Sequence, residues 1–217
     1  MPLIVYLKPR KPQVILEATP MDLSLPLILA SQSPRRRRLL ERLGLSFAVQ
    51  VSPAEEIIPE NASPSAVVEH LAREKAEAVA MQHPEALTLA ADTIVVFDDE
   101  ILGKPETTDA ARHMLRRLSG TTHTVLTGLA LFHPAGDQTI VAHESTAVTF
   151  GRLSDDEIEA YVATESPMDK AGSYGIQDDT GALFVERIEG DYYNVVGLPL
   201  RRFYVLLRTH FERALHL

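Results

Sequence analysis

The chain has 217 residues, a formal net charge of −9 at pH 7 and no cysteine. Without cysteine it can form no disulfide, iron–sulfur cluster, thiol nucleophile or cysteine-ligated zinc site. Residues 1–50 hold eight Lys and Arg against three acids, whereas residues 51–217 are strongly acidic. Because most of the surface then repels a phosphate backbone, we expect no nucleic-acid polymer as a partner.

Residues 1–24 contain several prolines and show no clear periodicity. We expect a poorly ordered N-terminal extension there, with Met21 as an alternative start, followed by one domain over residues 25–217. No apolar stretch reaches about 18 residues, so no membrane span is predicted. Residues 1–19 also lack the apolar core of a signal peptide, which favours a cytoplasmic location.

A buried strand is predicted over residues 25–30, a polar turn over residues 31–34 and a helix from Arg35 to Leu43. Ligands of open α/β sheets bind at such a place, beyond the carboxyl end of a strand and at a helix start. The backbone N–H groups and the hydroxyl of Ser31 can hold phosphate oxygens there.

Arg35 and Arg36 are unusual residues for the first turn of a helix. The helix dipole makes a cation there unfavourable by about 0.3–1 kcal/mol, and a polyanionic ligand would reverse the sign. The pair therefore favours a phosphate site, although a solvated basic helix face remains the alternative. The Gly-x4-Gly-Lys-Ser/Thr pattern of a P-loop is absent.

A strand over residues 45–51 leads into a loop over residues 52–62, and Ser63–Pro64 begins a helix that runs to about Met81. The loop carries Glu55, which is a candidate metal ligand. Lys75 lies on or near the buried side of the helix, where it could contact phosphate. For each residue taken alone, a surface role is the simpler interpretation.

Asp92 and Thr93 interrupt the apolar strand predicted over residues 87–97. An unpaired carboxylate in such a place costs several kcal/mol unless a cation or donor accompanies it. Such a group suits a magnesium ligand or a general base. The alternative is an aspartate that closes a strand end or caps a turn.

The later elements alternate strands with helices around an antiparallel pair. This order predicts an α/β protein with a mixed β-sheet and flanking helices. The predicted elements are a helix over residues 108–118, strands over 122–132 and 140–150 joined by a turn at 134–137, a helix from the capping box at Ser154 to about 164, a strand over 182–188 and a helix over 199–215.

Two further loops carry polar residues with a candidate role. Lys104 stands between a glycine and a proline, which would present it from a rigid loop, although a surface role is the simpler interpretation when it is taken alone. The segment 169–177 contains two glycines, which permit close approach of the backbone to a ligand. Gln177 can form a two-point hydrogen-bond pair with a base edge, but an ordinary polar loop is an equal interpretation.

The histidines lack metal spacing, and the Gly-x-Ser-x-Gly and Gly-x-Gly-x-x-Gly patterns are absent, so serine hydrolases and dinucleotide oxidoreductases lack support. Seven segments, in this order, resemble the Maf family of nucleoside triphosphate pyrophosphatases. They are LASQSPRR (29–36), LAREKA (71–76), AADTIV (90–95), LGKP (102–105), LSG (118–120), DKAGSYGIQ (169–177) and VVGLPL (195–200).

The resemblance implies a fold related to that of inosine triphosphatases, with two lobes around a central cleft, often as a homodimer. It implies hydrolysis of a nucleoside triphosphate to the monophosphate and pyrophosphate with a divalent cation, Mg²⁺ or Mn²⁺. By motif position, Asp92 would activate water or hold the metal, and Glu55 would help to hold it. The implied substrate-binding residues are Ser31, Lys75 and Lys104 for phosphates, with Arg36 beside them, and Arg35, Thr93 and Gln177 for the base.

Within the family, Thr93 and the Gly175–Gln177 segment resemble the branch that acts on dTTP and UTP, with the branch that acts on 7-methyl-GTP as the alternative. Two other interpretations stay open. One is a non-enzymatic nucleotide-binding regulator of cell division or septum formation, which would need the phosphate site but not the carboxylates. The other is an inosine triphosphatase, which the Ser31–Arg36 motif and Gln177 do not suit.

Overall fold

The computed structural model describes residues 21–178 and 180–216. Its main sheet is mixed, because β2 is parallel to β3 and β4 whereas the other neighbours are antiparallel. The mixed α/β fold predicted from the sequence is thereby confirmed. In spatial order the strands are β3 (Ala48–Val49), β2 (Leu27–Leu29), β4 (Leu87–Phe97), β6 (Thr122–His133), β7 (Gln138–Phe150) and β8 (Val185–Glu189), with β5 (Glu100–Leu102) beside β4.

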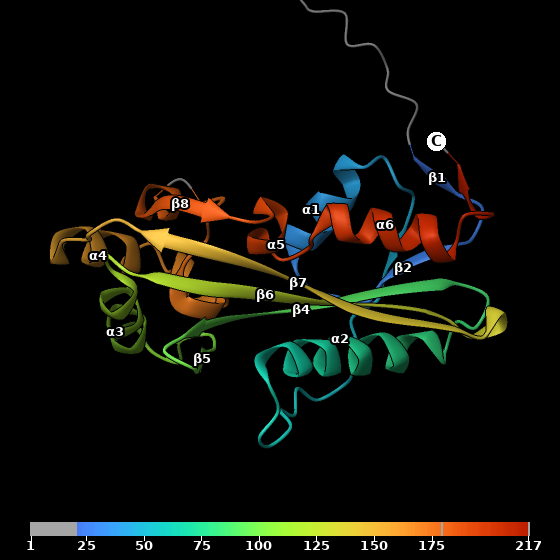
Figure 1. Ribbon diagram of the computed structural model, residues 1–217, viewed down its shortest axis with the longest axis horizontal. Helices are drawn as coiled ribbons and strands as arrows, with labels where there is room; N and C mark the ends of the chain where they lie inside the picture. The colour runs from blue at the N-terminus through green and yellow to red at the C-terminus, as the bar shows by residue number, and fades with distance from the viewer. Residues whose placement is uncertain (1–20, 179, 217) are drawn as a thin grey trace, which may run out of the picture.

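Helices cover both faces of the sheet (Figure 1). One face carries α2 (Pro64–Ala80), and the other carries α1 (Pro34–Arg42), α5 (Tyr192–Val196) and α6 (Leu200–His210). At the far end of the long strands, α3 (Thr108–Leu118) packs against α4 (Asp155–Val162). The strands β4, β6 and β7 therefore connect two groups of elements, which correspond to the two lobes expected from the resemblance.

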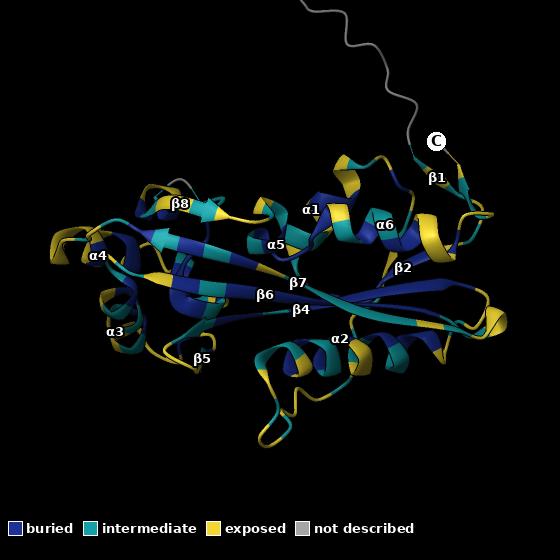
Figure 2. Ribbon diagram, viewed as in Figure 1, coloured by how far each residue is buried: buried dark blue, intermediate teal, exposed yellow. Residues whose placement is uncertain are grey.

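Around residues 89–90 and 129–131 the two faces of the sheet differ in the size of their side chains. Alternate residues of a strand point to opposite faces, and in β4 and β6 the small residues Ala90 and Ala130 belong to the core under α2. The intervening leucines Leu89, Leu129 and Leu131 belong to the larger core under α1 and α6. Figure 2 shows that the central parts of β4 and β6 are buried.

One glycine sets the distance between α2 and the sheet. A Cβ atom on Gly128 in β6 would lie 2.1 Å from the carbonyl oxygen of Val68 in α2. The helix backbone therefore rests directly on the strand, which only glycine permits. Gly128 pairs with Asp92 across the sheet, and Lys75 follows Val68 by about two helical turns, so this contact brings Lys75 close to Asp92.

Several predicted boundaries are wrong at the edges of the fold. The C-terminal helix ends at His210 and not at 215, because Phe211 is buried in the core and Leu215–His216 form β9, which pairs with β1 (Asp22–Leu23). The strand predicted over 182–188 begins at Val185, after a 3₁₀ turn, η4 (Gly181–Phe184). Only Ala48–Val49 of the strand predicted over 45–51 pairs in the sheet.

Residues 1–20 of the expected poorly ordered extension (residues 1–24) lie outside the described residues. Its described part contains β1, which contacts the C-terminal end of the chain. Three further 3₁₀ turns complete the fold: η1 (Pro134–Gly136), η2 (Ser166–Asp169) and η3 (Ala171–Ser173). Of the helices within residues 21–178 and 180–216, none has the length and apolar character needed to cross a bilayer.

Candidate active site

A cavity of about 710 Å³ opens between the two groups of elements. Its walls come from the β2–α1 turn, the loop before α2, the middle of β4, the loop after β5 and the segment between η2 and residue 177. Sequence reasoning proposed nine site residues, and the structure brings eight of them to this cavity: Ser31, Arg35, Arg36, Lys75, Asp92, Thr93, Lys104 and Gln177.

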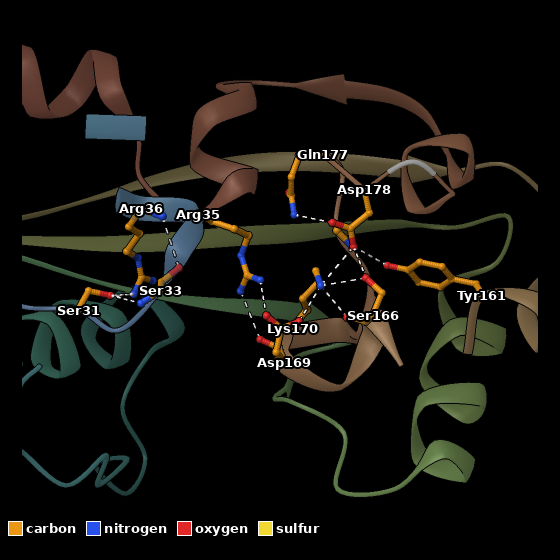
Figure 3. Close-up of polar contacts among 11 residues, drawn as sticks. Ser31, Ser33, Arg35, Arg36, Tyr161, Ser166, Asp169, Lys170, Gln177 and Asp178 are labelled. Carbon is orange, nitrogen blue, oxygen red and sulfur yellow. Dashed lines mark hydrogen bonds and ion pairs between the residues drawn. The ribbon is translucent and has the colours of Figure 1, made fainter. Parts of the chain in front are cut away.

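The β2–α1 turn is held by its own serines. Ser33 caps α1, because its hydroxyl accepts a hydrogen bond from the backbone N–H of Arg36 at 3.4 Å. The hydroxyl of Ser31 accepts from the N–H of Ser33 at 3.1 Å and from Arg36 Nη1 at 3.3 Å. The turn therefore presents Ser31 and the start of a helix to the cavity in one fixed arrangement (Figure 3).

Arg36 is a fixed cation in the cavity wall. Its Nε donates to the carbonyl oxygen of Gly197 at 2.8 Å, and its Nη2 donates to Thr93 Oγ1 at 3.1 Å. Thr93 in turn lies 2.9 Å from Thr127 Oγ1. Burial lowers the pKa of Arg36 from its ordinary value, and nearby Asp92 opposes this shift. These contacts hold the guanidinium in place beside Asp92, where an anionic ligand would meet it without reorganisation.

Lys75 joins two carboxylates at the centre of the cavity. Its Nζ donates to Asp92 Oδ1 at 2.5 Å and to Glu56 Oε1 at 2.7 Å. The Asp92 side chain is only 11% exposed, so the lysine provides the charge that a carboxylate within an apolar strand requires. The hydrogen bond from Lys75 also lowers the pKa of Glu56, which keeps that carboxylate ionised.

The prediction that Glu55 reaches the site differs from the structure. Glu55 is exposed and does not line the cavity, whereas its neighbour Glu56 does. The loop before α2 has no regular secondary structure at this point, and successive residues of an extended segment point to opposite sides. The loop therefore directs one of the two adjacent carboxylates toward Lys75 and the other toward solvent.

The opposite wall is built from loop side chains that bind one another. Arg35 Nη1 donates to Asp169 Oδ2 at 2.5 Å, and Lys170 Nζ donates to Asp169 Oδ1 at 2.6 Å. Burial raises the pKa of Asp169, but the hydrogen bonds from Lys170 and Arg35 outweigh it, so the pKa lies below its ordinary value. We call this wall the loop end and define it by its cavity-lining residues Asp169, Lys170 and Gln177.

Sequence reasoning missed Lys170, which lines the cavity, and Asp178, which contacts two lining residues from outside it. Lys170 is only 8% exposed and lies 3.2 Å from Asp178 Oδ2. Asp178 Oδ1 accepts from Gln177 Nε2 at 2.9 Å (Figure 3). The lysine lies within the motif at 169–177, but its burial depends on how the irregular segment from Ser166 to Asp178 folds around its side chain. The sequence pattern carries no signal of that fold.

Charge is concentrated in the cavity with the sign opposite to that of the chain. Among the lining residues, five are cationic (Arg35, Arg36, Lys75, Lys104 and Lys170) and three are acidic (Glu56, Asp92 and Asp169). In the part of the chain that the structure describes, Lys104 forms no ion pair. A net positive cavity in a protein of charge −9 suits a small polyanion, which can enter where a polymer is repelled.

Asp92 and Glu56 are the lining carboxylates that a divalent cation near Lys75 would meet. Asp92 and Glu56 already converge on one cation, the ammonium of Lys75. Across residues 21–178 and 180–216, no group of three or more His, Asp or Glu side chains is arranged to hold a metal. Magnesium is usually bound through one or two carboxylates together with substrate phosphates. The two carboxylates fit an ion shared with a substrate and not a cage made by protein alone.

A family model and curated relatives match most of the chain. The family model described as Maf-like protein matches residues 26–210. A dTTP/UTP pyrophosphatase of Salinibacter ruber is 59% identical over 195 residues, which is 90% of this chain and 96% of the relative. A dTTP/UTP pyrophosphatase of Bacillus cytotoxicus is 50% identical over 189 residues, 87% of this chain and 97% of the relative.

Among solved structures, a nucleoside-triphosphatase, also described as a dITP/XTP pyrophosphatase, from Mycobacterium abscessus shows a much weaker similarity. It aligns with a TM-score of 0.41 at 16% identity and covers 59% of this chain and 76% of its own.

Proposed function

Because the chain belongs to the Maf-like protein family, we propose that it hydrolyses dTTP and UTP to the nucleoside monophosphate and pyrophosphate. The relatives described above carry this activity in their names, and they match this chain over almost their whole length. The observation in the molecule that best supports the proposal is the buried Asp92, set among fixed cations in a net positive cavity.

In the proposed reaction, the triphosphate lies along the cationic wall. The start of α1 provides backbone N–H groups and the hydroxyl of Ser31 for phosphate oxygens. Arg36 is already oriented by its hydrogen bonds to Gly197 and Thr93, so little entropy is lost when it receives the phosphate charge. Lys104 adds a second cation from the loop after β5.

Asp92 acts on the water molecule. Its carboxylate orients a water and accepts a proton from it as the water oxygen attacks the α-phosphorus. The bond between the α-phosphorus and the bridging oxygen breaks, and pyrophosphate leaves with that oxygen. Lys75 neutralises charge beside Asp92, and its bonds to two carboxylates hold its ammonium in the cavity.

A divalent cation is part of the proposal. Asp92 and Glu56 would hold it together with phosphate oxygens, and when bound it would neutralise charge that develops on those oxygens. In this arrangement Glu56 takes the role that sequence reasoning gave to Glu55. Mg²⁺ and Mn²⁺ both suit carboxylate and phosphate oxygens.

The base lies toward the loop end in this proposal. Gln177 offers an amide, Arg35 is bonded to Asp169 at the same wall, and Thr93 lines the cavity from β4. A uracil or thymine edge presents an N–H donor beside a carbonyl acceptor. The amide of one glutamine can pair with both.

The test is a nucleotide screen with the purified chain. Each nucleoside triphosphate, 7-methyl-GTP included, is incubated with Mg²⁺ or Mn²⁺, and the products are separated by chromatography. We expect dTMP or UMP with pyrophosphate. Orthophosphate with a diphosphate would contradict the reaction, and a preference for 7-methyl-GTP would contradict the substrate. Tight binding without turnover would favour the non-enzymatic regulator.

A cytoplasmic homodimer completes the proposal, on the basis of the family resemblance. Sedimentation equilibrium of the purified chain measures the oligomeric state directly. A mass of 24.0 kDa at micromolar concentration would contradict the dimer. Fractionation of cells that express the chain tests the location.

A further inference from the structure

We propose that Asp178 is a positioning residue that sets which way the amide of Gln177 faces, and that it thereby makes the site select uracil and thymine over cytosine. This inference rests on the proposed function, because it assigns the base-recognition step of that reaction. It concerns a residue outside the cavity lining that acts through one residue within it.

The first step concerns the contact between the two side chains. Gln177 Nε2 lies 2.9 Å from Asp178 Oδ1. A carboxylate can only accept hydrogen bonds, so the amide must turn its NH₂ group toward Asp178. Oε1 and the second N–H of Gln177 then remain for a ligand. Since Gln177 lines the cavity, this donor and acceptor pair is presented in one fixed order.

The second step concerns the hydrogen bonds that hold the Asp178 carboxylate in one orientation. Its other oxygen, Oδ2, accepts from Ser166 Oγ at 2.7 Å and from Tyr161 Oη at 3.0 Å, and Lys170 Nζ lies 3.2 Å away. Figure 3 shows these groups around the carboxylate. Three donors therefore converge on one oxygen and leave the other for Gln177.

Both hydroxyls are obliged to donate to Asp178. Tyr161 Oη already accepts from the N–H of Gly175 at 3.1 Å, and Ser166 Oγ already accepts from Lys170 Nζ at 3.1 Å. Each hydroxyl proton is thus left for Asp178 Oδ2. Lys170 Nζ, which can only donate, also lies 3.2 Å from Oδ2. The position of Oδ2 therefore favours an acceptor whichever side chain occupies residue 178.

The third step is the match to a base. Uracil and thymine carry an N–H at position 3 beside the carbonyl at position 4, which suits Oε1 and the second N–H of Gln177. Cytosine has the reverse order, an acceptor at position 3 beside an amino group. Uracil and cytosine have almost the same size, so the shape of the cavity does not distinguish them. The order of donor and acceptor along the base edge does.

The decisive variant is Asp178→Asn. Because the Oδ2 position must hold the acceptor, the asparagine has to place its NH₂ group where Oδ1 was, facing Gln177. Gln177 must then turn over to offer Oε1 to that group, which exchanges the donor and acceptor that it presents to the base. We expect the ratio of kcat/KM for UTP to that for CTP to fall at least about tenfold.

A matched control is Ser166→Ala, which removes one donor to Oδ2 and leaves the contact with Gln177. We expect its UTP to CTP ratio to stay within about twofold of the wild type, since no amide is forced to turn. A merely structural role for Asp178 would lower both rates together in the asparagine variant and leave the ratio unchanged, and that result would overturn the inference.

A measurement on the wild type guards against an unstable variant. UTP methylated at N3 lacks the proton that Gln177 Oε1 accepts, so we expect kcat/KM to fall at least about tenfold against UTP. Equal values would overturn the inference. Failure of the wild type to release pyrophosphate from UTP would overturn the proposed function as well, whereas an unchanged ratio in an active Asp178→Asn variant overturns the inference alone.

Discussion

The two walls of the cavity hold their side chains in different ways. The wall that we call the strand end (Ser31, Arg36, Lys75, Asp92 and Thr93) lies on strands, helices and the turn between them, and Arg36 there is fixed partly by a backbone carbonyl. At the loop end, side chains are oriented largely by one another, through Lys170 and Asp178. The comparison suggests that the first wall carries the chemistry and the second carries the selection of the base.

The largest effect is expected at the strand end. Asp92→Asn keeps the size of the side chain and the contact with Lys75 but removes the base, so kcat should fall by roughly 10²–10⁴. Because the loss concerns the attacking water and not the base, kcat should fall by the same factor for dTTP, UTP and CTP. Steady-state kinetics with the three nucleotides measures it, and a loss confined to one nucleotide would break the division between the walls.

At the loop end, removal of one lysine should destabilise the wall itself. Lys170→Met leaves Asp169 and Asp178 without their common cation, and we expect the free energy of unfolding to fall by about 2–3 kcal/mol. This is below the cost for a fully buried pair because Asp169 is 59% exposed. Urea unfolding measures the change, with Lys104→Met as the control. Equal stability of the two variants would show that the loop end does not depend on Lys170.

The adjacent glutamates provide a matched pair within one loop. Glu56→Gln should lower kcat/KM by about 10- to 100-fold and raise the metal concentration for half-maximal rate, because a charged ligand near phosphates is lost. Glu55→Gln should leave both quantities within about twofold, since Glu55 is exposed outside the cavity. Metal titrations of the rate of the two variants distinguish the two glutamates. A larger effect in Glu55→Gln than in Glu56→Gln would assign the metal role to Glu55.

The smallest expected effect comes from a histidine that supports the loop end. His123 is 2% exposed, its Nε2 lies 2.8 Å from Tyr174 Oη, and burial lowers its pKa to about 4. In the unfolded chain the imidazole of His123 binds a proton below about pH 6.5, whereas the native imidazole binds one only near pH 4. The contribution of His123 to stability is therefore fully present above about pH 6.5 and is lost as the pH falls toward 4.

The slope due to His123 should not exceed about 1.4 kcal/mol per pH unit. Urea unfolding at several pH values gives the slope for the wild type, and His123→Phe, which keeps an aromatic ring, removes this contribution while other groups keep theirs. Identical slopes in the two proteins would mean that the buried imidazole is not the group that titrates.

Sequence patterns predicted the strand end well because its residues lie in regular elements. The burial of Asp92 followed from its apolar strand, and the position of Lys75 followed from helical spacing. The choice between Glu55 and Glu56 could not be predicted, since their loop has no period that relates residue number to direction. The capping box at Ser154 was confirmed, because that signal is local.

The loop end could not be predicted, because its order arises from side-chain contacts within an irregular segment and with residues outside it. The Tyr161 hydroxyl reaches Asp178 from α4, and His123 reaches Tyr174 from β6. The short helix α5 was also missed, although Asp191 caps it and could have signalled its start. The early end of α6 depends on the pairing of β9 with β1, which joins the two ends of the described chain.

The long strands have a consequence for how the cavity can move. The strands β4, β6 and β7 have 11, 12 and 13 residues and run from one lobe to the other, and β6 is bonded to a neighbour on both sides. Closure of two domains by a hinge needs a few residues whose backbone angles are free to change. A ladder bonded on both sides restricts such changes, so the long strands favour a constant orientation of the two lobes and leave movement at the cavity to the loops that line it.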